Sequence, residues 1–161
     1  MKLSVYIIFF VSLTGIALLF NCHFNSGGGQ QDPDPIDFDN EDCKEILIDE
    51  LKYDAAQTDE YEMDYAYIKG DTLNVIVKYG GGCGLANFRL ITNGLFMESH
   101  PVQLDVILSF NDEDPCEALI TKQICFNILQ LATLYNDSYQ TGHGTIILRL
   151  KDYDDRLVYD F

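Results

Sequence analysis

The residues best suited to acid–base chemistry are two glutamates, Glu98 and Glu117, which lie between apolar stretches. Two carboxyl groups facing each other across a cleft can hydrolyse a glycosidic bond, one as the acid and the other as nucleophile or base. A serine hydrolase is not indicated, because Ser99 and His100 are sequence neighbours and neighbours on a strand face opposite ways. Glutamates near turns more often accept backbone N–H bonds. We therefore expect no enzymatic activity, with a carbohydrate-active hydrolase as the alternative.

Clusters of aspartate supply hard oxygen ligands, the kind that calcium prefers. They are DFDNED (37–42), NDEDP (111–115) and DYDD (152–155). None fits the calcium loop of an EF-hand, and the cysteines and histidines lack the spacing of a zinc site. We therefore expect solvated turns and no bound metal or other cofactor, with weak calcium binding as the alternative. The candidate calcium ligands are Asp112, Asp114, Asp152 and Asp154.

Strands are the elements that would position these residues, because apolar residues recur at every second position after Cys43. The clearest strand is VQLDVILSF (102–110), whose apolar residues fall on one face. Further strands are predicted at 61–68, 72–79, 86–92, 116–128, 146–150 and 157–161, and the ambiguous segment 44–53 is also interpreted as a strand. About seven or eight strands separated by turns predict an all-β fold. Residues 43–161 would form a single antiparallel β-sandwich of immunoglobulin-like architecture.

Three tyrosines alternate with other residues in the first of these strands. Tyr61, Tyr65 and Tyr67 share one face with Met63, and the opposite face carries charged residues. If exposed, such a row would form a platform on which a glycan stacks. Because the opposite face is charged, we expect the tyrosines to pack in the core.

Four of the five cysteines lie within the predicted sandwich, and the directions of its strands indicate how they pair. If successive strands alternate up and down, Cys83 and Cys116 meet at one end, while Cys43 and Cys125 lie at the other. Cys116 cannot bond to Cys125, because nine residues of strand span about 30 Å and bridged Cα atoms lie within about 7 Å. We therefore predict Cys83–Cys116 and Cys43–Cys125 disulfides in an oxidising compartment. Free buried thiols are the alternative, chiefly for Cys125.

The fifth cysteine, Cys22, follows an uncharged apolar run of 18 residues that begins at Leu3. A positive start, an apolar middle and a processing site are the plan of a signal peptide. The residues LFNC at 19–22 resemble the lipobox of bacterial lipoproteins, in which the thiol is acylated and the chain is cut just before it. This resemblance implies a signal peptide over 1–21 and palmitate or a similar acyl group on Cys22. A flexible acidic tether over 22–42 would follow, and an uncleaved signal anchor is the alternative.

Three motifs of the domain resemble those of an uncharacterised group of small Bacteroidota lipoproteins. They are TLNVIVKYGGGC (72–83), ESHP (98–101) and CEALIT (116–121). The resemblance covers roughly 61–150. It implies a lipid anchor in the bacterial cell envelope, at the periplasmic or surface face of the outer membrane, and it brings no known activity.

The net charge of −16 bears on the kinds of partner that the protein can bind. So negative a surface repels phosphate backbones, so nucleic acid is not an expected partner. We expect an envelope lipoprotein that is anchored in the lipid bilayer through Cys22. Its β-sandwich would bind an unidentified protein or glycan, or support surface structure, without catalysis. An accessory subunit of an outer-membrane uptake or secretion complex is a further alternative.

Overall fold

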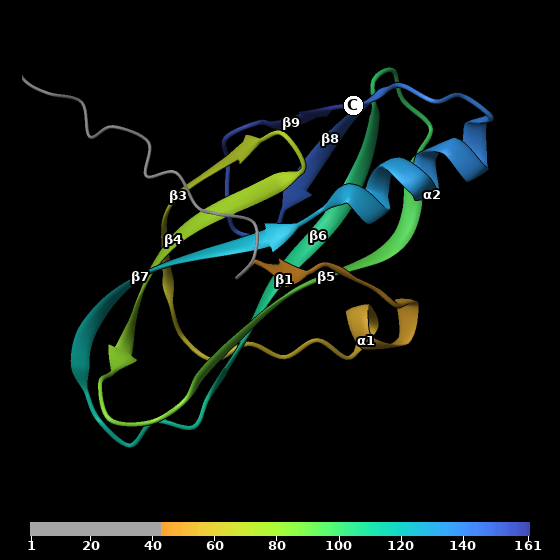
Figure 1. The fold of residues 1–161 in the computed structure, drawn as a ribbon. Coiled ribbons are helices and arrows are strands. Elements are labelled where there is room, and N and C mark those ends of the chain that lie inside the picture. The colour runs from red at the N-terminus through yellow and green to blue at the C-terminus, as the bar shows by residue number, and fades with distance from the viewer. Residues whose placement is uncertain (1–42) are drawn as a thin grey trace, which may run out of the picture. The chain divides into compact units, whose positions relative to one another are not determined.

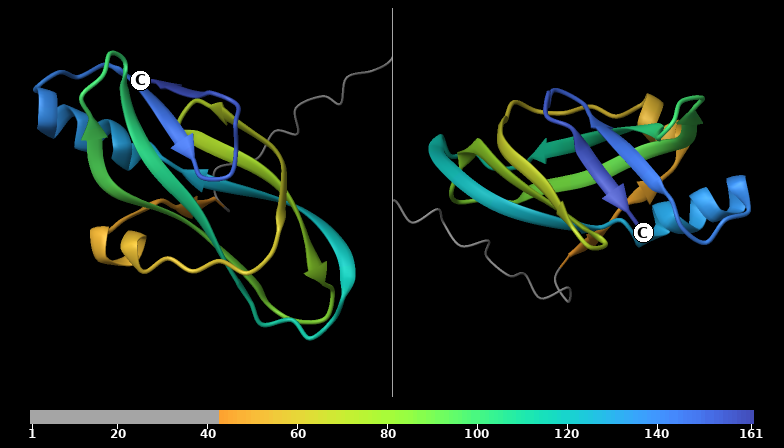
Figure 2. Two further views of the ribbon diagram at one scale, coloured as in Figure 1. Left: turned by 180° about the vertical axis from the view of Figure 1, so that it is seen from behind. Right: turned by 90° about the horizontal axis from the view of Figure 1, so that it is seen from above.

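The computed structural model describes residues 43–161, which form nine strands and two helices (Figure 1). In chain order the elements are β1 (Lys44–Glu45), β2 (Leu47–Ile48), α1 (Glu50–Asp54), β3 (Glu62–Lys69), β4 (Thr72–Gly81), β5 (Ala86–Met97), β6 (Val102–Asp112), β7 (Ala118–Asn127), α2 (Leu129–Tyr139), β8 (Thr145–Leu150) and β9 (Leu157–Asp160). The strands build two sheets, in the orders β1–β7–β4–β3 and β2–β5–β6–β8–β9. Figure 2 shows the two sheets as layers that face each other. The prediction of an all-β sandwich is confirmed.

The core lies between the sheets and is built from residues that alternate along each strand. In β6 every second residue is buried over the whole stretch from Val102 to Phe110. Leu73, Val75 and Val77 of β4 face them and are fully buried. Burying an aliphatic or aromatic side chain of this size contributes about 1.5–3 kcal/mol, so these two strands supply much of the stability of the domain.

The pairing of the strands is mixed, so the prediction of a wholly antiparallel sandwich is wrong in detail. The pairs β1–β7, β2–β5 and β6–β8 are parallel. The parallel neighbours β6 and β8 need a crossover connection, and it runs through β7 in the other sheet and then through α2. At the other edge the chain passes from β1 to β2 through Ile46, whose side chain is buried between the sheets.

Both helices replace strand or loop in the sequence prediction. Residues 44–53 do not form one strand, because two short strands are followed by α1. The carboxylate of Asp49 accepts a bond from the backbone N–H of Lys52 (3.1 Å), which caps α1 and ends the extended backbone. In α2, Leu131 is fully buried and anchors the helix to the core.

A bulge in β3 changes which face its tyrosines occupy. The register between β3 and β4 shifts between Met63 and Tyr65, and Ala66 then takes the core position. An extra residue at a bulge moves every later side chain to the opposite face. The prediction of core packing is therefore wrong for Tyr65, which is 51% exposed. It holds for Tyr61, whose hydroxyl donates to the carbonyl of Leu108 and whose burial raises its pKa to about 12.

The predictions for the N-terminal region concern residues outside the described part of the chain. These are the signal peptide (1–21), the acylated Cys22 and the tether (22–42). In residues 43–161, neither helix has the length and apolar character needed to cross a bilayer.

Candidate functional site

The two glutamates do not form a catalytic pair. Glu98 lies in the turn between β5 and β6, and Glu117 lies beyond the other end of β6, just before β7. β6 has eleven residues, so the two positions are separated by about 35 Å of strand. A glycosidase holds its carboxyl groups about 5–10 Å apart. The arrangement therefore gives the hydrolase alternative no site at Glu98 and Glu117.

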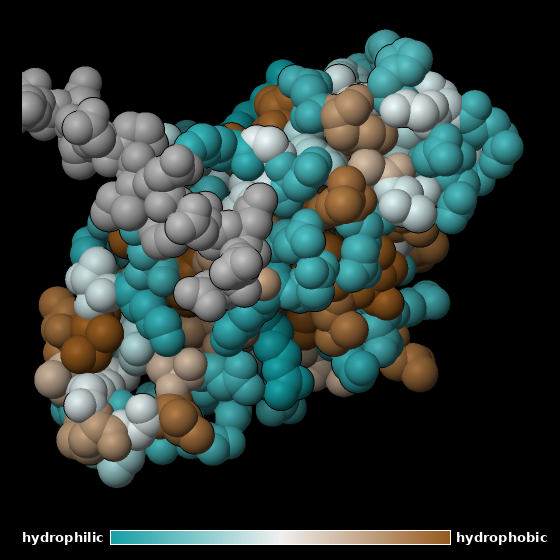
Figure 3. All heavy atoms as spheres, in the orientation of Figure 1, coloured by the Kyte–Doolittle hydropathy of each residue, from teal (hydrophilic) through white to brown (hydrophobic). Residues whose placement is uncertain are grey.

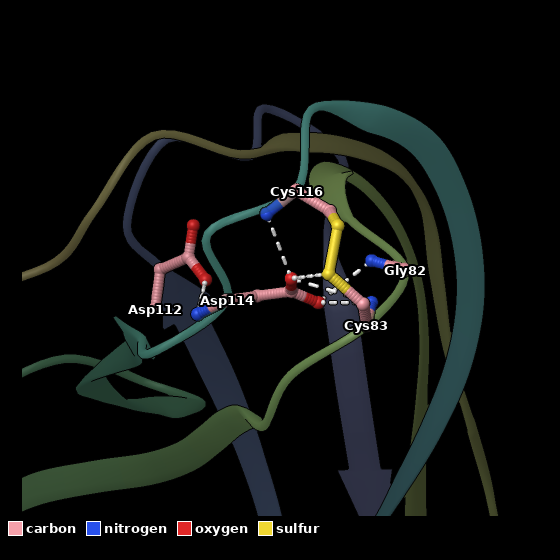
Figure 4. The surroundings of a disulfide bond; sticks show 5 residues. All are labelled: Gly82, Cys83, Asp112, Asp114 and Cys116. Atoms are coloured by element: carbon pink, nitrogen blue, oxygen red, sulfur yellow. Dashed lines mark hydrogen bonds between the residues drawn. A yellow bond between two sulfur atoms is a disulfide. The ribbon is translucent and has the colours of Figure 1, made fainter.

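The four cysteines of the domain form two disulfides. Cys43 is bonded to Cys125 with the Cα atoms 4.8 Å apart, and Cys83 is bonded to Cys116 with the Cα atoms 5.9 Å apart. These are the pairs that the strand directions predict. The first ties the chain just before β1 to β7, and the second joins the β4–β5 loop to the β6–β7 loop (Figure 4).

The Asp114 carboxylate holds the Cys83–Cys116 loops together. It accepts hydrogen bonds from the backbone N–H groups of Gly82 (2.6 Å), Cys83 (3.0 Å) and Cys116 (2.9 Å), as Figure 4 shows. The Asp114 N–H in turn donates to the carboxylate of Asp112 (2.8 Å). We call Asp114, Gly82, Cys83 and Cys116 the Asp114 clamp. Asp112 and Asp114 therefore help to hold the two loops in place.

The electrostatics of the Asp114 clamp favour the ionised carboxylate. Burial opposes ionisation of Asp114, but backbone N–H groups of Cys116, Gly84, Gly82 and Cys83 outweigh it and lower its pKa to about 2. Charge-assisted bonds of this kind are stronger than those between neutral groups. The sulfur of Cys83 also lies 3.4 Å from the carboxylate, but as half of a disulfide it has no proton to donate.

Close approach of the two loops explains the glycine run around Cys83. A Cβ added at Gly84 would lie 2.6 Å from the Cα of Asp114, closer than atoms can pack. Gly82 has φ of +121°, which side chains rarely adopt. Within residues 43–161, one group of potential metal ligands is close enough to share an ion, and it consists of Cys83, Asp114 and Cys116. The disulfide uses both sulfur atoms, so they are not available as thiolate ligands.

The same loop end exposes two large apolar side chains. Leu85 and Leu119 are 73% and 77% exposed. Figure 3 shows apolar surface gathered at this end, near the C-terminal end of β4 and the start of β7. Acidic residues lie at the same end of the sandwich: Asp112 ends β6, and Glu113 and Glu117 belong to the β6–β7 loop.

The other two predicted calcium ligands lie elsewhere, in the turn between β8 and β9. Asp152 and Asp154 line a pocket of about 610 Å³ to which Asp112 and Asp114 do not contribute. The pocket also holds several charged residues of both signs. They are Asp105, Arg149, Lys151, Asp155 and Arg156. Four carboxylates thus share the pocket with three cations, and Arg149 lies 3.5 Å from Asp105, so most of the negative charge in the pocket is offset.

A second pocket shares residues of this turn and lies beside the outward-facing tyrosines of β3. The rings of Tyr65 and Tyr67 stack with centroids 5.7 Å apart and planes inclined by 29°. They border a pocket of about 450 Å³ that is also lined by Tyr153, Asp155 and Arg156 of the β8–β9 turn. We call it the tyrosine pocket. The alternation of residues in β3 predicts these tyrosines to be in the core, because the bulge leaves no mark in the residue pattern.

Comparison with known proteins gives few matches. No protein-family model matches the chain, and no curated protein matches it significantly. Solved structures that are similar include a protein of unknown function, DUF1344, from Bacteroides vulgatus (14% identity, TM-score 0.44, 74% of this chain and 55% of that chain). A NigD-like immunity protein from Bacteroides caccae is also similar (13% identity, TM-score 0.47, 72% of this chain and 56% of that chain). So is a candidate lipoprotein from Bacteroides fragilis (14% identity, TM-score 0.45, 73% of this chain and 69% of that chain). The chain spans just over half the length of the first two.

Proposed function

We propose that this protein is a lipid-anchored protein of the bacterial outer membrane whose sandwich domain binds a partner molecule without enzymatic activity. Cys22 carries the lipid, 22–42 is the tether, and 43–161 is the binding domain. The observation that carries the proposal is the distribution of cysteines. Of the five, four are used in the two disulfides of the sandwich, which leaves Cys22.

Disulfides support a location outside the cytoplasm, because they persist in oxidising compartments. A leftover cysteine in such a protein needs another role. Only Asn21 separates Cys22 from the apolar run that begins at Leu3, and a polar, glycine-containing segment follows Cys22, which is the place for a lipid-bearing residue. Each buried methylene of an acyl chain adds about 0.8 kcal/mol, so two or more chains anchor a protein stably.

Among residues 43–161, the arrangement of the candidate acid–base residues supports a binding role. Glu98 and Glu117 are at opposite ends of β6, and the Asp114 carboxylate is committed to backbone donors. What the described surface offers instead is two open pockets beside the β8–β9 turn and an apolar loop end.

Intact mass spectrometry of the native protein tests the anchor. We expect a chain that begins at Cys22 and carries the mass of its acyl groups, less four hydrogen atoms for two disulfides under non-reducing conditions. A Cys22→Ser variant should remain unacylated and uncut. Asn21→Gly is the matched control, because glycine is usual before the lipobox cysteine and processing should continue. A native chain that begins at Met1 and has no acyl group would contradict the proposal.

A further inference from the structure

The tyrosine pocket combines an exposed aromatic surface with polar groups that have hydrogen-bonding capacity to spare. Tyr65 and Tyr67 lie two residues apart on the same face of an edge strand, and their stacked rings form one continuous surface. Tyr65 is half exposed, so much of this surface is in contact with solvent. Aromatic rings carry partial negative charge on their faces, which attracts the partially positive hydrogen atoms of C–H groups.

The polar wall of the pocket comes from the β8–β9 turn. The hydroxyl of Tyr153 lies 3.4 Å from the carboxylate of Asp155. Within residues 43–161, no ion pair joins Arg156 to an acidic group, and both Asp155 and Arg156 are exposed. The wall thus offers a carboxylate acceptor and a guanidinium donor whose charges cancel.

We propose that the tyrosine pocket binds a neutral saccharide. A pyranose ring has an apolar C–H face and an edge of hydroxyl groups. The face can lie on the rings of Tyr65 and Tyr67, while the hydroxyls bond to Asp155 and Arg156. A ligand site of this kind needs a few well-placed polar groups around an apolar surface, and this pocket has them.

Other ligand classes fit the tyrosine pocket less well. A peptide would add as a strand to the edge of β3, but the Tyr153 hydroxyl accepts from the Ala66 N–H and lies within bonding distance of the Ala66 carbonyl (3.1 Å each). These are the backbone groups that an added strand would need. An anionic ligand would be repelled by the charge of −16. An aliphatic ligand would displace water from Asp155 and Arg156 and offer them no polar atom in return.

The inference rests on the proposed function, since it names the ligand class of the tethered domain. The full-length protein is extracted in a detergent without a sugar headgroup. It is titrated by calorimetry with neutral hexasaccharides of glucose, mannose, xylose and N-acetylglucosamine. An oligogalacturonate serves as the anionic comparison. The mass of the same sample reports acylation of Cys22, so loss of the anchor and loss of binding are read separately.

Saturable binding of a neutral hexasaccharide is expected, with affinity at least tenfold lower in Tyr65→Ala and Tyr67→Ala. Tyr65→Phe keeps the ring and should lose less than threefold. Tyr139→Ala is the matched control, because this tyrosine is 44% exposed on α2 and does not line the pocket. Arg156→Ala tests the polar wall at an exposed turn, where folding is not at risk, and should also lower the affinity.

Three results would overturn the inference. One is that no neutral hexasaccharide binds, or that only oligogalacturonate does. Another is that affinity is unchanged in folded Tyr65→Ala, Tyr67→Ala and Arg156→Ala. The third is that Tyr139→Ala weakens binding as much as Tyr65→Ala, which would place the ligand elsewhere.

Discussion

Removing the disulfide of the Asp114 clamp gives a prediction whose size follows from the sequence separation of its cysteines. Cys83 and Cys116 are 33 residues apart, and the Cys43–Cys125 bond closes a loop of 82 residues. The chain-entropy relation converts these separations into about 3.7 and about 4.5 kcal/mol at 25 °C. We therefore expect the double variant Cys83→Ala/Cys116→Ala to lose about 3.7 kcal/mol of unfolding free energy.

Most of this loss should come from the unfolded state. Asp114 still accepts hydrogen bonds from the backbone N–H groups at positions 83 and 116 in the variant, because these donors do not depend on the sulfur atoms. The folded loops should therefore keep their shape. Urea unfolding, followed by near-ultraviolet circular dichroism, measures the change. The urea dependence should steepen, because the unfolded chain expands without the cross-link.

The Cys43→Ala/Cys125→Ala variant is the internal comparison and should lose about 0.8 kcal/mol more. Asp114→Asn, made with and without the Cys83–Cys116 bond, tests whether the carboxylate acts independently of it. A loss under about 1 kcal/mol for the Cys83/Cys116 pair would refute the entropic account. So would an Asp114→Asn effect that vanishes once the disulfide is gone, since the loops would then have lost their shape.

Three further predictions concern single residues. The pKa of Asp114 is lowered to about 2, so its contribution to the free energy of unfolding is complete above the unfolded value near 4 and is lost as pH falls toward 2. Melting temperatures measured over this range should decline on the acid side, and the decline should be shallower in Asp114→Asn. An identical decline in the variant would contradict the stabilising role of the carboxylate. Gly84→Ala should lower the melting temperature by several degrees, whereas Gly142→Ala, with open space around it, should not; equal effects would argue against close loop approach. Burial raises the pKa of Tyr159, whose hydroxyl donates to the carboxylate of Asp71 (2.7 Å). Tyr159→Phe should therefore lower the free energy of unfolding by about 1 kcal/mol, measured by urea unfolding. An unchanged free energy of unfolding would exclude this hydrogen bond as a stabilising contact.

Period-two patterning predicts most of the strands of the sandwich. The alternating direction of successive strands then predicts at which end of the sandwich each strand begins and ends. The same reasoning that brings Cys83 to Cys116 also places Glu98 at the opposite end from Glu117, so the separation of the glutamates was within reach of the sequence. The helix α2 was also within reach. Ile128, with three later residues at helical spacing, faces the core; these are Leu131, Ala132 and Tyr135. Interpreting 116–128 as one long strand concealed that change of period.

The tyrosine pocket could not have been predicted in this way. Its aromatic face depends on a register shift against β4 between Met63 and Tyr65, and its polar wall depends on β9 lying beside β3. Both follow from packing between segments about ninety residues apart, such as Ala66 and Tyr153. No local pattern carries information about contacts of that range.

The Cys43–Cys125 bond also determines how a pulling force on the leading end of the chain would reach the sandwich. A pull at Cys43 without the bond would act on β1, two residues long, and would peel it away one hydrogen bond at a time. The disulfide instead passes the tension to β7, which pairs with β4 along its whole length, from Ala118 to Asn127. Because β7 lies between β1 and β4 in its sheet, tension at Cys43 would reach a central strand directly and would not depend on the short β1.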